Sequence, residues 1–267
     1  MKVIAWLLAI VLLTPSALSL ALSFTTSRFL DFTGEWTLHW YRELFSDTPW
    51  RRALANSVLI GTLTAVVSTA TATAAAIALR RTRLGGGIEQ FLLMPLYVPG
   101  FVIAVGLLAF FRAGGLWGTH AGMVIAHSVV VFPVALLVVR ASLDRLNPDM
   151  EAAARGLGAG AWQSFRHVTW PLITPGVAAA ALFAFVISLN ETILALFLGT
   201  RDTTTVPRLI WPQLRFAVTP LAAAASGILV LITLPVVLLA ARQMRFTIEP
   251  WNNPRDETSS AQPPPPP

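Results

Sequence analysis

The sequence is poor in charge, since only 12% of its 267 residues are Asp, Glu, Lys or Arg. An ordinary soluble domain carries about 25% of such residues. Hydrophobic residues make up 55% of the chain, which leaves too little polar surface for a soluble fold of this length. The composition therefore predicts a membrane protein. Cysteine is absent as well, and this excludes disulfides and thiolate metal sites.

Lysine is nearly absent, because Lys2 is the only one. A phosphate-binding P-loop needs a lysine beside its glycines, so this chain cannot bind and hydrolyse ATP by that route alone. The sequence also lacks His-Glu-x-x-His and Gly-x-Ser-x-Gly motifs, and its histidines are not paired at ligand spacing. We therefore expect no catalytic, cofactor or metal site in this chain, and an intramembrane enzyme is disfavoured.

The net charge of +6 comes from arginines that stand singly or in pairs between apolar runs. This scattering is typical of membrane ends that face lipid head groups, and it does not favour a nucleic-acid partner. With the N-terminus inside the cell, the inner loops hold more of the basic residues than the outer loops do. The positive-inside rule thus predicts cytoplasmic N- and C-termini.

Six apolar stretches are each about 20 residues long, enough to cross a bilayer as helices. They predict an all-α membrane domain over residues 1–245, followed by a proline-rich tail, 246–267, that is expected to be disordered. The first stretch also has features of a signal peptide, with Ala21-Leu22-Ser23 as a cleavage-like site, but its length favours an uncleaved anchor. The predicted spans lie near 3–23, 53–79, 91–111, 121–139, 172–189 and 221–241, with an inner loop at 141–171.

Small residues and prolines indicate how these spans pack. Small residues recur every four positions along the second span, which lets another helix approach closely, although chance spacing in an Ala/Thr-rich helix is the alternative. Pro95 and Pro99 interrupt the third span, and Pro133 lies in the fourth. Such prolines indicate either a pathway through the protein or simple kinks. The small residues of the second span are Ser57, Gly61, Ala65, Thr69 and Thr73.

The inner loop contains a short polar segment that breaks the apolar pattern. Residues 147–151, Asn-Pro-Asp-Met-Glu, have the chemistry of a helix N-terminus, and three alanines continue the helix until Gly156 or Gly158 can end it. A second amphipathic piece, 162–170, then leads to Pro171, where we expect the next membrane helix to begin. A short helix with an alanine face suits insertion into a groove of another protein. An ordinary loop at the membrane surface is the alternative.

This segment resembles the EAA loop of the membrane subunits of binding-protein-dependent ABC importers. The family pattern is Glu-Ala-Ala, three residues, Gly, and then nine residues before Ile-x-Leu-Pro. The matching residues are Ala153, Ala154, Gly158 and Pro171, with Val168 and Trp170 at the Ile and Leu positions.

In the register of this match, Glu151 does not align with the motif's glutamate. Counting back from Gly158 places Ala152 at the position of the motif's glutamate. Glu151 then matches the acidic residue that often precedes that glutamate. Because one residue turns a helical side chain by about 100°, we expect Glu151 to differ from the usual glutamate in its contacts.

The resemblance covers most of the chain and is closest to the second permease of polyamine-type importers, a group that includes opine, phosphonate and ferric-ion systems. It implies a type I, MetI-like permease that forms the pathway for a small polar or charged solute in a bacterial inner membrane. The other segments that carry it are Ser23-Phe24, Asn56-Ser57, Leu96 to Gly100, Ser188 to Glu191, and Val206 to Pro220.

The resemblance also implies partners: a second permease, which by family habit is a different chain, ATPase subunits that hold ATP and Mg²⁺, and a periplasmic or lipid-anchored solute-binding protein. The 147–171 loop would contain the coupling helix that docks on the ATPase. Its candidate coupling residues are Glu151, Ala152, Ala153, Ala154, Gly158 and Pro171.

Asn190 and Glu191, at the outer end of the fifth span, are the candidate pathway residues, because ionisable groups at such positions are costly and often functional. The alternative is that Glu191 lies at the water interface and ends the helix. Residues 188–191, Ser-Leu-Asn-Glu, resemble a segment of polyamine-type importers that reads Ser-Leu-Asp followed by another acid. Asn190 therefore stands in place of the first acid. The alternative function is a secondary transporter without an ATPase, which would predict inverted repeats, and no convincing repeat is found.

Overall fold

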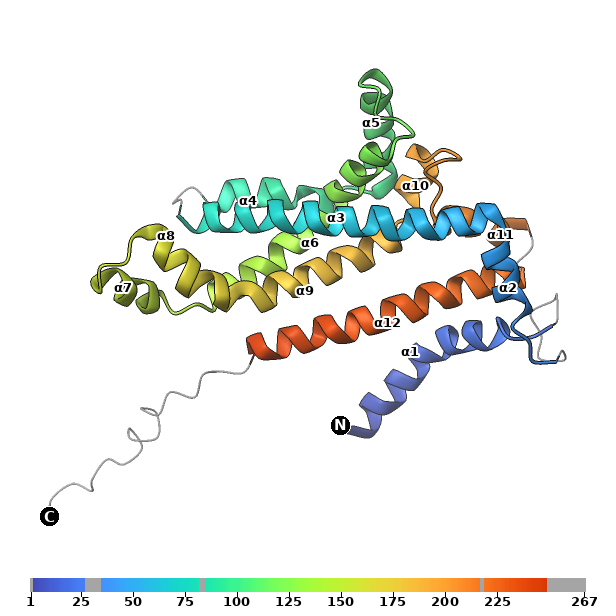
Figure 1. Ribbon diagram of the computed structural model, residues 1–267, viewed down its shortest axis with the longest axis horizontal. Helices are drawn as coiled ribbons and strands as arrows, with labels where there is room; N and C mark the ends of the chain where they lie inside the picture. Colours follow the sequence, from blue (N-terminus) through green and yellow to red (C-terminus); the bar gives the residue numbers. More distant parts are fainter. Residues whose placement is uncertain (1, 27–34, 82–84, 217–218, 249–267) are drawn as a thin grey trace, which may run out of the picture.

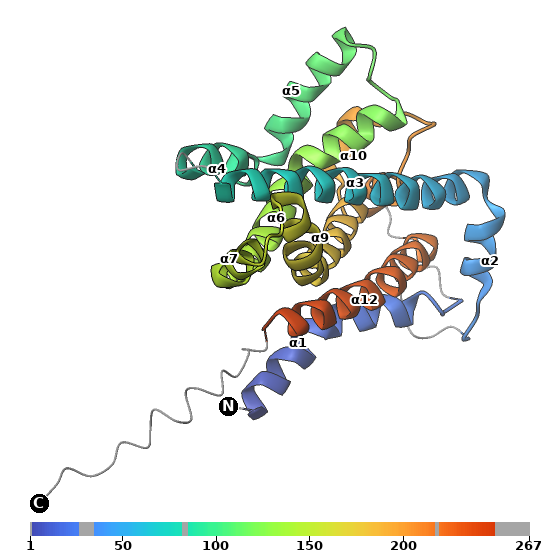
Figure 2. The ribbon, with the colours of Figure 1, turned by 60° about the vertical axis from the view of Figure 1, so that its left-hand side comes forward.

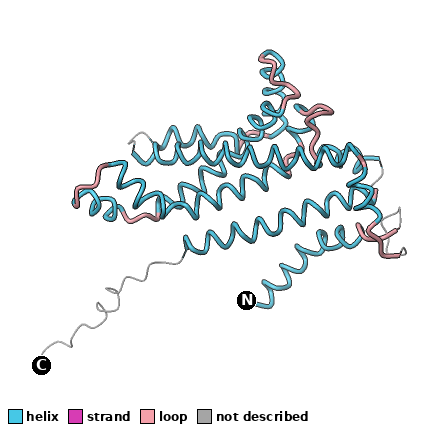
Figure 3. Tube along the Cα trace, in the orientation of Figure 1, coloured by secondary structure: helices cyan, strands magenta, loops and turns pink. Residues whose placement is uncertain are grey.

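A computed structural model describes residues 2–26, 35–81, 85–216 and 219–248. In this part of the chain every regular element is helical, which confirms the predicted all-α fold class (Figure 3). The helices are α1 (Lys2–Leu22), α2 (His39–Ser46), α3 (Thr48–Arg81), α4 (Gly85–Leu93), the 3₁₀ turn η1 (Met94–Leu96), α5 (Gly100–Ala113), α6 (His120–Asp144), α7 (Pro148–Gly156), α8 (Ala161–Ser164), the π-helical turn η2 (Phe165–Thr169), α9 (Trp170–Leu189), α10 (Ile193–Leu198), α11 (Val206–Phe216) and α12 (Pro220–Ile248).

Three long helices, α3, α6 and α9, pack on one another and form the centre of the bundle. On one side α12 packs on α9, and α1 packs on α12 (Figure 1). On the other side α5 projects from the bundle and packs against the short helix α10 (Figures 1 and 2). The two ends of the bundle differ, because α7 and α8 lie at one end while α2 and α11 lie at the other.

Helices cover all six of the predicted spanning ranges, but they differ in their ability to span a membrane. By length and hydropathy, α3, α6, the continuous helix that ends with α9, and α12 are spans. Two helical segments rather than one cover the third range. The first is α4 together with η1, the second is α5, and the chain bends by 95° between them. The break falls at the predicted prolines, because Pro95 lies in η1 and Pro99 directly precedes α5.

The first helix fits its predicted range, whereas the last helix extends beyond its predicted range. The helix α1 runs over 21 residues, Lys2–Leu22, within one residue of the predicted span 3–23, and it is long enough to cross a bilayer. At the other end α12 continues to Ile248 and so takes in the first residues of the predicted tail. The rest of that tail, 249–267, lies outside the described residues.

The stripe of small residues on α3 packs as predicted, since all five of its members are buried. Gly61 faces the ring of Phe185 on α9, where an added Cβ would lie 3.1 Å from the ring edge. Ala65 packs in a cluster with Val131 of α6 and Ala184 of α9. Small side chains therefore let α3 approach both of its central neighbours closely.

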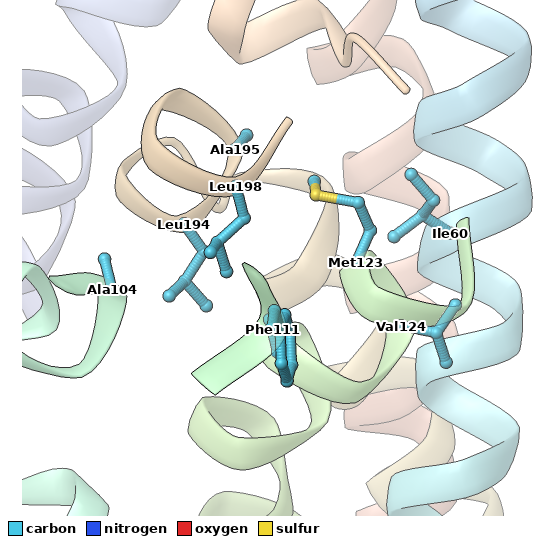
Figure 4. Close-up of a cluster of buried hydrophobic side chains, with 9 residues drawn as sticks. Ile60, Ala104, Phe111, Met123, Val124, Leu194, Ala195 and Leu198 are labelled. Carbon is cyan, nitrogen blue, oxygen red and sulfur yellow. The ribbon is translucent and has the colours of Figure 1, made fainter. Parts of the chain in front are cut away.

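A larger apolar cluster fixes the projecting helix α5. Figure 4 shows Phe111 of α5 beside Leu194 and Leu198 of α10, with Met123 of α6 on the far side. Phe111 is only 2% exposed, so a helix that leaves the bundle at a sharp angle is still anchored by one buried ring. Similar clusters join α3, α6 and α9 near α7, and α2, α3, α11 and α12 at the opposite end.

A polar network closes the end of the bundle that is opposite to α7. The buried Asn56 amide of α3 donates to the backbone carbonyls of Asp202 (2.7 Å) and Thr204 (3.0 Å). The Asn56 carbonyl oxygen lies 3.0 Å from Nε2 of His120, the first residue of α6. Next to it, Ser57 Oγ accepts from the Val206 N–H at 2.9 Å. This network ties the 199–206 loop to α3 and α6.

Replacing Asn56 with alanine is expected to lower the free energy of unfolding by about 2 kcal/mol, because half-buried carbonyls lose their donors. The measurement is the thermal unfolding midpoint of the purified protein in detergent. Asn190→Ala is the matched control, since the exposed Asn190 amide bonds only to the Val186 carbonyl of its own helix in the described structure. Equal shifts in the two variants would contradict a special role for Asn56.

Candidate functional site: the α7–α8 loop

The helix α7 begins and ends at the residues that the sequence singled out. The Asn147 side chain accepts a hydrogen bond from the Asp149 N–H at 2.9 Å, and Pro148 is the first helical residue. At the other end Gly158 has a φ of +88°, which an L side chain adopts only with strain. The N–H of Ala159 reaches the Ala154 carbonyl at 3.1 Å, which completes a Schellman motif. The predicted capping is confirmed, and of the two glycines it is Gly158 that ends the helix.

The outer face of α7 and its following turn is apolar and open to solvent. Ala152 and Ala153 are exposed, whereas Ala154 is half-buried. Leu157 is 91% exposed, and an added Cβ on Gly158 would meet nothing within 4 Å. Small and apolar side chains that face outward on a protruding helix form a surface suited to another protein's groove.

Glu151 behaves differently from the alanines beside it. Its Oε1 accepts a hydrogen bond from Nη1 of Arg80 at 2.9 Å and from Oγ1 of Thr169 at 2.6 Å. The Thr169 hydroxyl is the main cause that lowers the pKa of Glu151 below its ordinary value; burial opposes this shift, and the Arg80 charge adds to it. The carboxylate is therefore ionised at neutral pH and turned toward its own chain.

The second half of the loop is helical without interruption into the membrane span. Residues 161–189 pass from α8 through η2 into α9, which begins at Trp170, one residue before the expected start at Pro171. Pro171 has no N–H to give, and it lies in the first turn of α9 directly after the π-helical turn. In η2 the Trp170 N–H reaches the Phe165 carbonyl, and this wider turn re-aligns the chain ahead of the proline.

The two candidate pathway residues lie at the opposite end of the bundle, in the turn between α9 and α10. Glu191 Oε1 accepts from the Leu194 N–H at 3.0 Å and so caps the first turn of α10. Asn190 is exposed, and its amide donates to the Val186 carbonyl at 2.9 Å. The structure thus separates these residues from the coupling residues by the length of α9, and it gives Glu191 a structural contact.

Sequence reasoning missed Arg80 and Thr169 as partners of Glu151. Arg80 was expected only as an inner-loop cation, and Thr169 carried no expectation. They stand 71 and 18 residues away from Glu151, so no local spacing rule links the three residues. Only the packing of α7 against η2 and beside the end of α3 brings them together.

Comparisons with known proteins agree with this architecture. The sequence matches the family described as "Binding-protein-dependent transport system inner membrane component" over residues 68–247. It is 28% identical to the putrescine transport system permease protein PotI of Escherichia coli strain K12 over 230 residues, 80% of this chain and 82% of that protein. It is 31% identical to the trehalose transport system permease protein SugB of Mycobacterium tuberculosis over 205 residues, 74% of each chain.

Solved structures show the same fold. A crystal structure of a bacterial ABC transporter involved in the import of alginate matches with a TM-score of 0.71 over 94% of both chains, at 16% sequence identity. The MetNI methionine ABC transporter in an inward-facing conformation matches with a TM-score of 0.60 over 76% of this chain and 100% of that chain. Nothing in these matches supports the alternative of a secondary transporter. The chain belongs to the family of binding-protein-dependent transport system inner membrane components, and it is a multi-pass membrane permease subunit of a bacterial ABC importer rather than an enzyme.

Proposed function

We propose that α7 is the coupling helix of this importer, and that its exposed apolar face docks in a cleft of a separate ATPase subunit. The observation that carries the proposal is the outward presentation of Ala152, Ala153 and Leu157 on a capped helix at one end of the bundle. Ala154 is half-buried beside this face, the exposed Gly158 ends the helix, and Pro171 lies in the first turn of α9. ATP and Mg²⁺ would bind to the ATPase and not to this chain.

The other partners follow from the same type of importer. A second permease, a different chain, would complete the solute pathway, and a periplasmic or lipid-anchored binding protein would deliver the solute at the end formed by α2 and α11. This places α7 and both termini on the cytoplasmic side of a bacterial inner membrane. Inner-loop arginines at the α7 end, among them Arg145, Arg155 and Arg166, favour that orientation.

The proposed solute is small and polar or charged: a polyamine, an opine or amino-acid-like compound, a phosphonate or a ferric ion. Relatives named for putrescine and for spermidine/putrescine transport support the polyamine class. A relative named for trehalose transport shows that uncharged solutes also occur among similar chains. The resemblance to polyamine-type importers implies an acidic residue at the position of Asn190, where this chain has an amide. Glu191 already caps α10. The proposal therefore keeps all four solute classes.

Replacing Ala153 with tryptophan is expected to remove the ATPase from the purified complex. Overpacking a fitted interface costs about 1–3 kcal/mol, and each 1.4 kcal/mol is about tenfold in affinity, so retention should fall by about tenfold. The measurement is the ratio of ATPase to permease after affinity purification from membranes. Ala141→Trp is the control, because Ala141 is an exposed alanine on α6 and lies outside the 147–171 segment that contains α7. Normal ATPase retention by Ala153→Trp would overturn the docking of α7.

A further inference from the structure

The helix α7 has few means of holding its orientation by itself. It has nine residues, which is too short for an isolated helix to be stable in water. Three residues connect it to α6, and a four-residue turn that contains Gly158 connects it to α8. Among its larger contacts with described elements are those to α8 and η2, which belong to the same loop. Its link to the central helices therefore depends on individual side chains.

Apolar packing does not supply that link on the inner side of α7. A cavity of about 330 Å³ lies there between the loop and the bundle. Its lining includes Ile77 of α3, Leu143 of α6 and Phe165 of η2, together with Arg80, Glu151 and Thr169. Because this space is not filled by side chains, the hydrophobic cores of the bundle end before they reach α7.

Glu151 bridges this gap with one oxygen atom. Arg80 is the penultimate residue of α3, and Thr169 is the last residue of η2, directly before α9. Both donate to Oε1 of Glu151, at 2.9 and 2.6 Å. Thr169 is 4% exposed, and the Arg80 and Glu151 side chains are about one-quarter exposed, so the three groups are largely shielded from water. Charge-assisted hydrogen bonds of this length are among the stronger polar contacts in proteins.

We propose that Glu151 is a positioning residue, which together with Arg80 and Thr169 clamps α7 to the inner ends of α3 and α9. This inference rests on the proposed docking of α7 on an ATPase. The clamp makes α7, α3 and α9 move together, so a displacement of α7 by the ATPase reaches two of the three central helices. Glu151 would serve this link from inside the subunit, while the exposed alanines contact the partner.

The register of the sequence is consistent with this division of roles. Ala152 stands at the family's glutamate position and is exposed, whereas the Glu151 carboxylate turns inward. Consecutive helical residues point about 100° apart, so the two positions cannot serve the same contact. The lowered pKa of Glu151 agrees with an ionised carboxylate that is held by its donors.

The test uses the complete importer complex with its ATPase subunits in lipid nanodiscs without nucleotide. This chain contains no cysteine, so a pair of engineered cysteines gives its only thiol labelling sites when it is spin-labelled before assembly with its partners. Suitable positions are the exposed Ala78 on α3 and the exposed Arg155 on α7, which lies about 200° around the helix from Ala153 and so away from the docking face. We expect a single narrow distance peak in the parent complex. Glu151→Gln, which removes the charge and weakens both hydrogen bonds, and Arg80→Gln, which removes the ion pair, should each broaden that peak and still retain the ATPase.

Three further variants make the result specific. The reversed pair, Arg80→Glu with Glu151→Arg, should restore the narrow peak, which a merely structural loss would not do. Arg166→Gln, which removes an exposed arginine from η2, should leave the peak unchanged. Combining Glu151→Gln with Arg80→Gln should broaden the distribution no more than either change alone, because both remove the same contact.

Opposite outcomes would overturn the inference. An unchanged distance in Glu151→Gln would show that the clamp does not hold α7. Loss of the ATPase in Glu151→Gln, with normal retention in Arg80→Gln, would identify Glu151 as a contact to the ATPase instead. Failure of the docking proposal is seen separately: in that case Ala153→Trp retains the ATPase, while the distance measurement on the Glu151 and Arg80 variants still reports on the clamp.

Discussion

Replacing Gly176 with alanine is expected to lower the free energy of unfolding by about 2–3 kcal/mol, although alanine is the better helix former. Gly176 lies on α9 where that helix crosses α6, and an added Cβ would overlap the Ser142 side chain, reaching 2.6 Å from its Cβ. Ser142 is 5% exposed, and its Cβ is fixed by the α6 backbone, so rotation of the hydroxyl alone cannot relieve the overlap. Overpacking costs about 1–3 kcal/mol, and here it should exceed the gain of up to about 1 kcal/mol in helix propensity.

Variants of Ser142 distinguish steric overlap from a general effect of the Gly176→Ala substitution. Ser142→Gly should rescue Gly176→Ala, because it removes both overlapping atoms. Ser142→Ala should rescue it less, because the Cβ remains. Gly106→Ala on α5 is the matched control, since its added Cβ would meet nothing within 4 Å, and it should be neutral or slightly stabilising. Thermal unfolding midpoints in detergent report all four variants, and equal midpoints for Gly176→Ala and Gly106→Ala would contradict the close crossing.

Replacing Gly118 with alanine is expected to destabilise the protein by about 3 kcal/mol, the sum of two separate costs. Gly118 has a φ of +74°, a left-handed conformation that costs an L residue about 1–2 kcal/mol. In addition, an added Cβ would lie 2.5 Å from the Thr200 methyl carbon, which overpacks the contact at a cost of about 1–3 kcal/mol. This contact joins the α5–α6 turn to the 199–206 loop.

A neighbouring glycine separates the two costs experimentally. Gly115 has nearly the same φ, +70°, but an added Cβ there would meet nothing within 4 Å. Gly115→Ala should therefore show only the backbone cost, about 1 kcal/mol. Thr200→Ser keeps the hydroxyl that donates to the Gly118 carbonyl and removes the methyl group, so it should bring Gly118→Ala down to the level of Gly115→Ala. If Gly118→Ala and Gly115→Ala already agree, the steric contact has no energetic weight.

Local features of this fold could be predicted because they depend on adjacent residues. The cap at Asn147, the end of α7 at Gly158 and the break at Pro95 and Pro99 each follow from one residue type in its immediate context. Helices likewise cover the apolar ranges. The small residues of α3 were recognised by their spacing, which reflects a property of one helix face.

Other features could not be predicted, because they depend on contacts between distant residues. The 95° bend after η1 depends on the packing of Phe111 against α10, which no spacing in the sequence shows. The continuity of the helix from α8 into α9 was not predicted because it depends on a π-helical turn, and such turns have no simple sequence rule. The partners of Glu151 were missed since α3 and η2 are remote in the chain.

The unbroken helix from Ala161 to Leu189 also acts as a lever. Its 29 residues give a length of about 43 Å at 1.5 Å per residue. One end contacts α7 through η2, and the other end carries Asn190 and Glu191. A tilt of about 5° about the end near α7 would therefore displace the turn at the opposite end by roughly 4 Å, as follows from the helix rise. That is about two-thirds of the helical pitch of about 5.4 Å, so a small rotation at the loop suffices to shift the turn that carries Asn190 and Glu191 relative to its neighbours.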